Sequence, residues 1–296
     1  MRTDGIHALN GLLPEEFALV RELQLMCNAH DGVNVKFNYD MMRRRDPGMN
    51  CDYCYYMSGK LAGYLALDRF GTKAELTSAV HPDFRRQGIF KRLYFAAISE
   101  AAIGPVDSLL LVGYRGSGAG SAAIASLGVS LKESEYCLRA TIDELVQPKA
   151  GTMDLEPVSI TNEDQIETLS NLLQISFPNA TWGSPSDIRK ELSQEGYYYW
   201  FALKNGQRIG QIGAISTGDS GYIRGVGVLP ELRGRGYGRR MLFSVLQKLI
   251  VLGNRHFELD VATENESALS VYTSCGFVVK TVYDYYDATA LIKSNH

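Results

Sequence analysis

The chain has 296 residues, more than the ~100–200 of a usual single domain, with 45% hydrophobic and 21% charged residues. Lysine and arginine number 30 and aspartate and glutamate 33, which gives a net charge of -3. These values predict a soluble globular protein with a substantial core, and they exclude a disordered chain, a disulfide scaffold and a strongly basic nucleic-acid binder.

Targeting, membrane and metal signals are missing from the sequence. No apolar run reaches the ~18 residues of a membrane span, and the N-terminal residues lack the apolar core of a signal peptide. Cys51 and Cys54 have a C-x-x-C spacing, but no second cysteine or histidine pair completes a zinc site. We therefore expect a cytoplasmic monomer or homodimer without a metal, a membrane partner or a nucleic-acid partner.

Apolar periodicity predicts a similar order of elements in each half of the chain. In the first half we expect a helix, three strands and a helix, at residues 14–29, 52–57, 61–67, 74–80 and 88–102. The second half begins with an extended piece at 155–158 and a helix that starts near residues 161–164. Two strands at 197–203 and 208–215 flank Asn205-Gly206, a strong hairpin signal. The last expected elements are a strand, a long helix, a strand, a helix and a strand, at 222–228, 236–252, 257–261, 267–274 and 278–283.

One offset relates the two halves of the chain, and repeats of this kind determine architecture. The residues that recur as the same type 148 positions later are Val80, Pro82, Arg85, Gly88, Leu111 and Gly128. One register kept over so many positions predicts two copies of one fold, joined by a linker that contains Pro and Gly. We expect an N-terminal domain at 1–147 and a C-terminal domain at 153–296. Antiparallel strands followed by β-α-β-α units predict the α/β class, with a mixed sheet in each domain.

The segment from Arg233 to Gly238 follows a predicted strand and opens a long amphipathic helix. Such a turn directs free backbone N–H groups and the positive end of a helix dipole at one point, which suits a pyrophosphate. Its glycines allow close approach, while Arg233, Arg235 and Arg239 add positive charge. Taken alone, the pattern fits an ordinary strand–helix connection equally well. It is neither a Walker A loop nor a dinucleotide fingerprint.

A second block downstream favours the phosphate site. It resembles the second signature of the GNAT superfamily of acyl-CoA-dependent N-acetyltransferases at Asn265, Ala268, Tyr272, Gly276 and Phe277. The turn also matches that family's [Q/R]-x-x-G-x-[G/A] signature at every defined position. The resemblance covers residues 153–296 well and 1–147 more weakly. Tandem pairs of this kind resemble mycothiol synthase and the self-resistance acetyltransferases of zwittermicin and paenilamicin producers.

The resemblance implies two tandem GNAT domains, each with a mostly antiparallel sheet whose central strand pair splays apart. Acetyl-CoA would bind where the strands at 222–228 and 257–261 separate, with its pyrophosphate on the turn amides and its pantetheine against Asn265. Tyr272 would be the general acid that protonates the leaving thiolate. The implied coenzyme-binding residues are Val226, Gly227, Val228, Arg233, Gly234, Arg235, Gly236, Tyr237, Gly238, Arg239 and Asn265.

A general base is also needed, because lysine-like amines are protonated at neutral pH. Glu264, Asp260 and Glu258 lie near the end of the strand at 257–261, and alternation places Glu258 and Asp260 on one face. We take Glu264 as the catalytic candidate beside Tyr272, although the sequence does not decide among the three acids.

The N-terminal copy departs from the family pattern. Phe90 ends its turn where the signature has Gly or Ala, and Ile124 stands at the position of Tyr272. An isoleucine cannot protonate a thiolate, so we expect this copy to be catalytically silent, as either a weaker second coenzyme site or a scaffold. The second site would comprise Val80, Arg85, Arg86, Gln87, Gly88, Ile89 and Phe90.

The leading hypothesis is an acetyl-CoA-dependent N-acetyltransferase. Its C-terminal domain would acetylate a primary amine of a small molecule or peptide by direct attack. A mildly acidic, tyrosine-rich chain suits a cationic acceptor such as an amine-rich antibiotic, acetylated for self-resistance. The alternatives are a non-catalytic acyl-CoA sensor, and an acyltransferase for a protein or an aminoacyl-tRNA-linked substrate. The near-neutral charge of both halves argues against tRNA.

Overall fold

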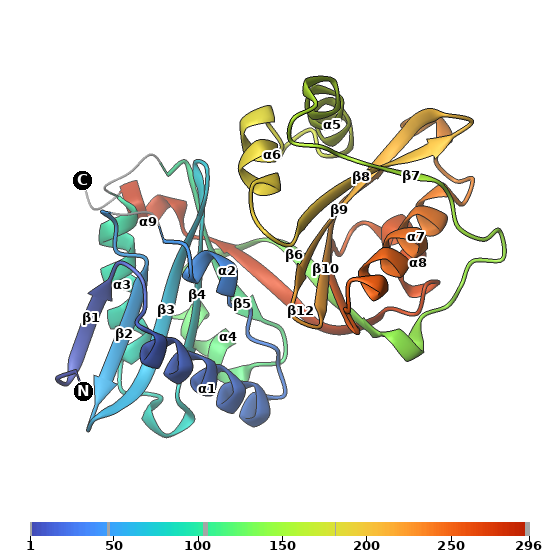
Figure 1. Cartoon of the computed structure of the whole chain (residues 1–296). Helices are drawn as coiled ribbons and strands as arrows, with labels where there is room; N and C mark the ends of the chain where they lie inside the picture. Colours follow the sequence, from blue (N-terminus) through green and yellow to red (C-terminus); the bar gives the residue numbers. More distant parts are fainter. Residues whose placement is uncertain (1, 46–47, 103–105, 181, 294–296) are drawn as a thin grey trace. The chain divides into compact units, whose positions relative to one another are not determined.

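A computed structural model describes residues 2–45, 48–102, 106–180 and 182–293. The chain forms two compact units (Figure 1): unit 1 is Met1–Ser134 with Thr281–His296, and unit 2 is Glu135–Lys280. These units differ from the predicted contiguous halves, because the last strand of each sequence copy passes into the unit formed by the other copy. Residues 135–147 therefore belong to unit 2, and residues 281–296 belong to unit 1.

Unit 1 contains a mixed sheet in the order β1-β2-β3-β4-β5-β12, in which β4 and β5 are parallel and the other paired neighbours are antiparallel. Its strands are β1 (Gly5–Leu9), β2 (Asp52–Met57), β3 (Lys60–Phe70), β4 (Lys73–Val80), β5 (Ser108–Tyr114) and the later part of β12 (Val278–Asp287). Its helices are α1 (Pro14–Asp31), α2 (Tyr39–Met42), η1 (Pro82–Phe84), α3 (Ile89–Ala101), α4 (Gly118–Ala125) and α9 (Thr289–Lys293).

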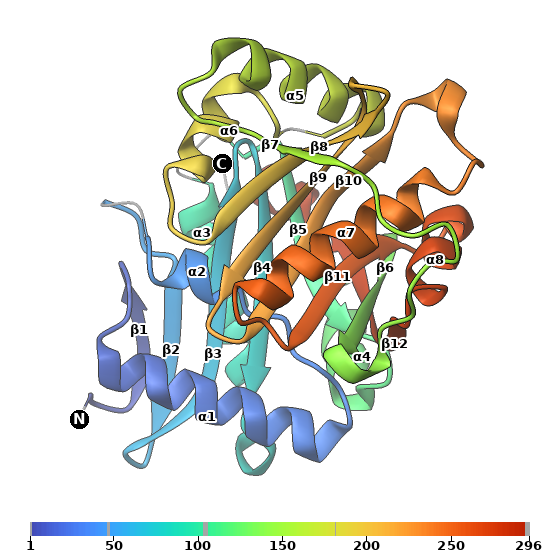
Figure 2. The ribbon, with the colours of Figure 1, turned by 45° about the vertical axis from the view of Figure 1, so that its right-hand side comes forward.

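Alternation along β3 assigns the two faces of this sheet. Leu65 and Leu67 join the core cluster that includes α3, whereas Tyr64 and Asp68 contribute to a polar layer on the other face. There Arg45, almost fully buried, donates two hydrogen bonds to Asp52 and one to Asp68. Figure 2 shows α1 in front of the sheet and α3 behind it.

The strands of unit 2 pair in the order β6-β11-β10-β9-β8-β7, in which β10 and β11 are the parallel pair. Its strands are β6 (Ser130–Thr141), β7 (Leu155–Pro157), β8 (Tyr197–Lys204), β9 (Gln207–Thr217), β10 (Ser220–Val228) and β11 (His256–Ala262), of which β6 begins in unit 1. Its helices are η2 (Ile142–Glu144), α5 (Glu163–Ser176), α6 (Pro185–Leu192), η3 (Pro230–Leu232), α7 (Tyr237–Val251) and α8 (Glu266–Thr273).

The faces of the sheet in unit 2 are likewise set by alternation, along β8. Trp200 and Ala202 pack with α7 in one core cluster, while Tyr199 and Phe201 pack with α5 and α6 in another. The sheet therefore has an α7/α8 face and an α5/α6 face. The sequence predicted α5 and α7 but not α6, which begins at a Ser184 cap followed by Pro185.

Structural equivalence confirms the predicted repeat. After β4 and its counterpart β10, the elements of the second copy start 148 residues after those of the first: η1 and η3, α3 and α7, β5 and β11, α4 and α8. Before that point the spacing is 147, since β3 starts at Lys60 and β9 at Gln207. The extra residue of the second copy lies within β10, whose pairing with β9 shifts by one residue between Arg224 and Gly227.

Both cysteines of the C-x-x-C segment are buried in unit 1. Cys54 lies in β2 and is fully buried, and Cys51 is buried just before it. Burial raises the pKa of the Cys54 thiol to about 12, which leaves it unreactive at neutral pH. Across the part of the chain that the structure describes, no helix is both long and apolar enough to span a bilayer.

Candidate active site

The central strands of unit 2 separate at a defined rung. β10 and β11 pair in parallel at Ser220–His256, Gly221–Phe257 and Tyr222–Glu258, and the pairing ends there. Beyond Tyr222, β10 follows β9 while β11 pairs with β6. The β11-facing backbone of residues 223–228 therefore lies outside the ladder, where an extended ligand can pair with it. This confirms the predicted splay.

A β-bulge at Gly225 shapes the edge of this opening. Gly225 has φ +58°, a left-handed conformation that favours glycine. The extra residue changes the phase of the strand: Val226 and Val228 pack on the α7/α8 face, and Gly227 faces α5. A side chain at Gly227 would force Ser176 to move, because a Cβ atom there would lie 2.1 Å from Ser176 Oγ.

The Arg233–Gly238 turn follows directly and is an uncapped helix start. Gly234 and Gly236 have φ +72° and +79°, and the space into which a Cβ atom would project is open at both. Gly236 is the N-cap of the 15-residue α7, and none of the described side chains caps the helix. Its first-turn amides are thus available to an anion, the arrangement that binds phosphate at helix N-termini.

The arginines of the turn divide into two pairs. Arg233 and Arg235 are exposed, and Arg233 Nε donates to the Val228 carbonyl at 2.9 Å. Arg239 and Arg240 instead donate to the carbonyls of Ser274 and Thr152, so they join α7 to neighbouring segments. The first pair fits the predicted phosphate contact, whereas Arg239 has a structural contact that the sequence did not predict.

Tyr272 lies on α8 with its ring in the core of unit 2, where it packs edge-on against Phe277 at 6.4 Å between centroids. Its side chain is 7% exposed, and burial raises the pKa of its phenol to about 12. The phenol therefore stays protonated at neutral pH. Among the described residues its hydroxyl has no hydrogen-bond partner, so its proton is not committed elsewhere.

Asn265 and Glu264 lie in the turn between β11 and α8. Asn265 is the N-cap of α8, and its Oδ1 accepts from the Ala268 amide at 3.0 Å. This cap explains an asparagine at the start of the signature, and it leaves Nδ2 for a ligand. Glu264 is exposed beyond the end of β11.

The α5/α6 face of the opening carries charged and aromatic residues that the sequence analysis did not group. Tyr222 Oη donates to Asp260 Oδ2 at 3.1 Å. Beside them Arg224 pairs with Glu191 of α6 at 2.9 Å and lies 5.4 Å from the Trp182 ring. Glu191 and Trp182 come from a region without a sequence motif, so only their position in space associates them with the opening.

A model of the acetyltransferase (GNAT) family matches this chain twice, at residues 18–104 and 166–277. The chain belongs to this family. Acetyltransferases of the GNAT family use acetyl-CoA, and the two matches confirm a tandem GNAT architecture.

Curated relatives support the same assignment. The chain is 26% identical to a mycothiol acetyltransferase of Mycobacterium sp. (strain MCS), over 95% of this chain and 97% of that protein. It is 31% identical to the N-alpha-acetyltransferase RimI of Mycobacterium tuberculosis (strain ATCC 25618 / H37Rv), over 43% of this chain and 82% of that protein. The chain is thus an N-acetyltransferase of the GNAT family.

Solved structures share the tandem fold. A GCN5-related N-acetyltransferase from Sphaerobacter thermophilus superposes with a TM-score of 0.78 at 18% identity, covering 97% of this chain and 96% of that one. A tandem GNAT protein from the clavulanic acid biosynthesis pathway has a TM-score of 0.71 at 19% identity, covering 96% of this chain and 97% of that one. At these identities the similarity describes the fold alone.

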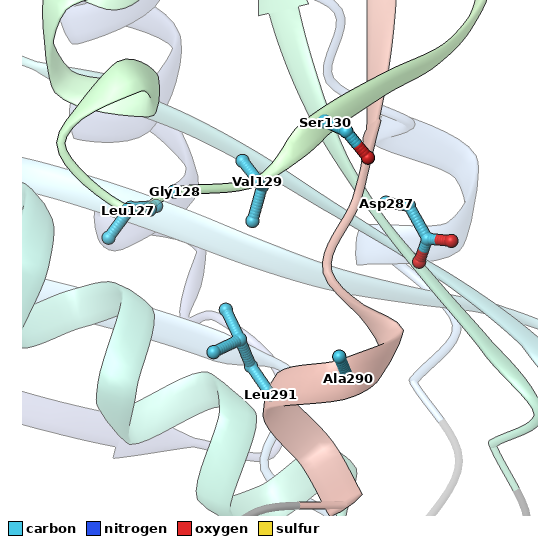
Figure 3. A pocket seen from close by; sticks show the side chains of 7 residues that line it. All are labelled: Leu127, Gly128, Val129, Ser130, Asp287, Ala290 and Leu291. Carbon is cyan, nitrogen blue, oxygen red and sulfur yellow. The ribbon is translucent and has the colours of Figure 1, made fainter.

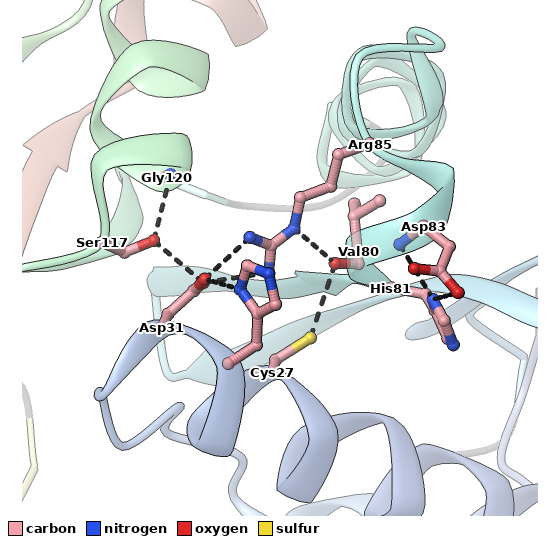
Figure 4. A network of polar contacts seen from close by, with 9 residues as sticks. Cys27, Asp31, Val80, His81, Asp83, Arg85, Ser117 and Gly120 are labelled. Atoms are coloured by element: carbon pink, nitrogen blue, oxygen red, sulfur yellow. Dashed lines mark hydrogen bonds and ion pairs between the residues drawn. The ribbon is translucent and has the colours of Figure 1, made fainter.

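The N-terminal GNAT copy keeps the shape of the turn but uses its arginine differently (Figure 4). Gly88 has φ +77°, like Gly236, and Arg86 adopts φ +63° where the second copy has Gly234. Arg85 donates to both carboxylate oxygens of Asp31, at 2.8 and 2.9 Å, and to the Val80 carbonyl at 3.0 Å. Asp31 also accepts from Ser117 Oγ, the N-cap of α4, at 3.2 Å.

Asp31 thus links the turn after β4 to the turn after β5. Burial opposes its charge, but hydrogen bonds from Arg85 and His30 outweigh this and lower the pKa of the Asp31 carboxyl. We call Asp31, Arg85 and Ser117 the acid bridge. Its counterparts in the C-terminal GNAT copy are Arg233 and Asn265, which no carboxylate connects in the described structure.

Other predicted residues of the N-terminal copy are core residues. Ile89 is 2% exposed and Ile124 is 5% exposed, both within the unit 1 core. Phe90 stacks on Tyr94 at 5.8 Å. β4 pairs with β3 without a register shift, so this copy has no counterpart of the Gly225 bulge.

Two surface cavities do not coincide with the predicted site. One of about 240 Å³ in unit 1 is lined by Leu127, Gly128, Val129, Ser130, Asp287, Ala290 and Leu291 (Figure 3). Another of about 370 Å³ in unit 2 is lined mainly by residues 157–160 and 197–200. Neither includes a residue of the Arg233–Gly238 turn.

Proposed function

We propose that unit 2 transfers the acetyl group of acetyl-CoA to a primary amine of a small molecule or a peptide. The observation that carries this proposal is the adjacency of two features in one unit. The strand edge that leaves its ladder at Tyr222 leads directly into the uncapped start of α7. Together they offer backbone groups for an extended arm and amides for a pyrophosphate.

The residues present fit this coenzyme. The amides of residues 234–238 and the side chains of Arg233 and Arg235 would hold the pyrophosphate, and the backbone of Val226 and Val228 would face the pantetheine arm. Asn265 Nδ2 would donate to the same arm. When bound, acetyl-CoA supplies an acetyl group activated as a thioester. Tyr272, protonated at neutral pH, holds the proton that a departing thiolate requires.

We further propose that the chain holds one coenzyme. The N-terminal turn keeps its backbone shape, but Asp31 neutralises Arg85, the first arginine of the turn. The preceding strand, β4, lacks the bulge. Ile124 also offers no proton. This supports the scaffold alternative for the N-terminal copy over a second coenzyme site.

The acceptor class is tested with a panel of amines. The panel contains short peptides with a free α-amine, polyamines, aminoglycosides and peptide antibiotics, each incubated with acetyl-CoA and analysed by mass spectrometry. We expect a mass increase of one acetyl group on at least one class, with cationic antibiotics included as the self-resistance candidate. Calorimetry with acetyl-CoA alone should give one site per chain. Coenzyme binding without any acetylated product would favour a sensor.

A further inference from the structure

The hydrogen-bonded pair Tyr222 and Asp260 lies at the point where β10 and β11 part. Tyr222 occupies the last paired rung, opposite Glu258, and Asp260 is two residues further along β11 on the same face as Glu258. The Tyr222 side chain therefore reaches along the strand into the opening. Both residues are half-buried, and alternation places both on the α5/α6 face of the sheet.

We propose that Asp260, acting through Tyr222, is the general base that removes the proton from the acceptor ammonium. This assignment rests on the proposed function and replaces Glu264 in that role.

The two faces of the sheet provide the physical argument. Leu259 and Val261 point into the α7/α8 core, where Tyr272 lies, so Asp260 between them points to the opposite face. A direct transfer needs one group to take a proton from nitrogen and another to give a proton to sulfur. Tyr272, the proton donor, lies on the α7/α8 face, and Asp260, the proposed base, lies on the α5/α6 face. The opening between the strands therefore separates protonation of the sulfur from deprotonation of the amine.

The other acids near the opening are less suited. Glu258 forms an ion pair with Arg139 of β6, so its carboxylate already has a partner within the sheet. Glu191 pairs with Arg224 and also accepts from Tyr199 Oη at 2.9 Å. Glu264 follows the end of β11 and is exposed, outside the rung at which the strands part.

The groups that face Asp260 come from β10, from β6 and, through Glu258, from β11 itself. β10 contributes Tyr222 and, next on the same face, Arg224. β6 contributes Cys137 directly opposite Asp260, and Arg139 opposite Glu258. The Cys137 thiol and carboxylate oxygens of Glu258 and Asp260 lie within 4.8 Å of one another.

The proton step balances without another reactant. The ammonium of the acceptor transfers one proton to Tyr222 Oη, while the phenolic proton of Tyr222 moves to Asp260 Oδ2. The products are a neutral amine, a neutral Tyr222 and a protonated Asp260, which later releases its proton to water. The amine lone pair is then free to attack the carbonyl carbon. The carbon–sulfur bond breaks as Tyr272 gives its proton to the sulfur, and the second proton that the nitrogen loses on becoming an amide restores the Tyr272 phenol through solvent.

The test compares Asp260→Asn and Tyr222→Phe with two matched controls in unit 2. Glu195→Gln removes an exposed carboxylate, and Tyr198→Phe removes a phenol that stacks on Trp200 on the other face. Turnover is measured against pH with an acceptor from the amine panel. Calorimetry gives the affinity for acetyl-CoA alone and for the acceptor alone, and melting temperatures report folding.

We expect Asp260→Asn to lower kcat/KM at neutral pH by about 10²-fold or more, the usual effect of a general base. The loss should shrink as pH rises toward the amine's own pKa, because the amine is then neutral without help. Acceptor affinity should fall because the ammonium loses its counter-charge, while acetyl-CoA affinity stays within twofold. Tyr222→Phe should show the same pattern with a smaller loss, and both controls should match the wild type.

Some results would overturn the Tyr222–Asp260 relay but leave the proposed function standing. These are unchanged pH profiles in both variants, or a loss of turnover in Glu264→Gln in place of Asp260→Asn. A loss that is equal at every pH and accompanied by lower melting temperature would assign the pair a purely structural role and would also overturn it. If the wild type acetylates no amine of the panel, the proposed function fails and the relay fails with it.

Discussion

Arg85 and Asp31 form a bidentate ion pair in unit 1, with nitrogen–oxygen distances of 2.8 and 2.9 Å. Arg233, the counterpart of Arg85 in the repeat, has no carboxylate partner among the described residues of unit 2. The same turn is thus neutralised by the protein in one copy and left electropositive in the other. This difference supports the proposal that the C-terminal copy holds the coenzyme and the N-terminal copy is a scaffold.

The acid bridge should stabilise unit 1 in a pH-dependent manner. Asp31 and Arg85 are 13% and 18% exposed at their side chains, so Asp31→Asn should lower the free energy of unfolding by about 1–3 kcal/mol at neutral pH. The pKa of Asp31 is lowered from 3.8 in the folded state, so this stabilisation exists above pH 3.8 and disappears as pH falls through the folded value. Urea unfolding of the wild type and of Asp31→Asn, from neutral to acid pH, measures this contribution. A difference in the free energy of unfolding that does not change with pH would contradict the ion pair.

The two helix-start glycines form a matched pair of test sites. Gly236→Val and Gly88→Val each place a branched side chain at φ near +78°, so both should cost about 1–2 kcal/mol of stability. Only Gly236→Val should weaken acetyl-CoA binding, by tenfold or more, because we propose that the coenzyme binds at this turn alone. Calorimetry on both variants decides; equal losses of affinity would place a coenzyme at each turn.

Tyr272→Phe should reduce kcat about 10²-fold and leave acetyl-CoA affinity nearly unchanged. The fold should tolerate the change, since the hydroxyl has no hydrogen bond to another described residue. The raised pKa of about 12 gives the wild type stability that is present below pH 10 and lost as pH rises through 12, and the variant should lack this loss. Ile124→Val, at the equivalent site of unit 1, is the control and should leave kcat unchanged.

Deletion of Gly225 should convert β10 to the register of β4. Unit 1 demonstrates that the fold accepts the unbulged strand, so the variant should fold. We expect kcat to fall at least tenfold, because the strand edge beside the opening changes course, with a smaller effect on acetyl-CoA affinity at the unchanged turn. Circular dichroism, calorimetry and turnover separate the two effects; full activity would remove the bulge from the site.

Local signals predicted most of the individual elements. The β2 bounds 52–57 were predicted without error, and Asn205-Gly206 forms the expected hairpin turn with φ of 50° and 76°. These succeed because hairpin geometry and strand alternation depend on neighbouring residues. The bulge also left a sequence signal, the change of repeat spacing from 147 to 148, which identifies its position only when both copies are aligned.

The sequence alone determined that the chain holds two copies of one fold, because residue spacing along the chain sets the strand–turn–helix geometry of each, and two motifs of the second copy resembled the GNAT family. It also determined which copy has the phenol and the complete turn. Tertiary structure decided which unit receives each last strand, that Asp31 neutralises Arg85, and that Tyr222 meets Asp260. Those contacts join residues 38 or more positions apart, and partners so distant are chosen by packing and charge in three dimensions, which no local pattern records.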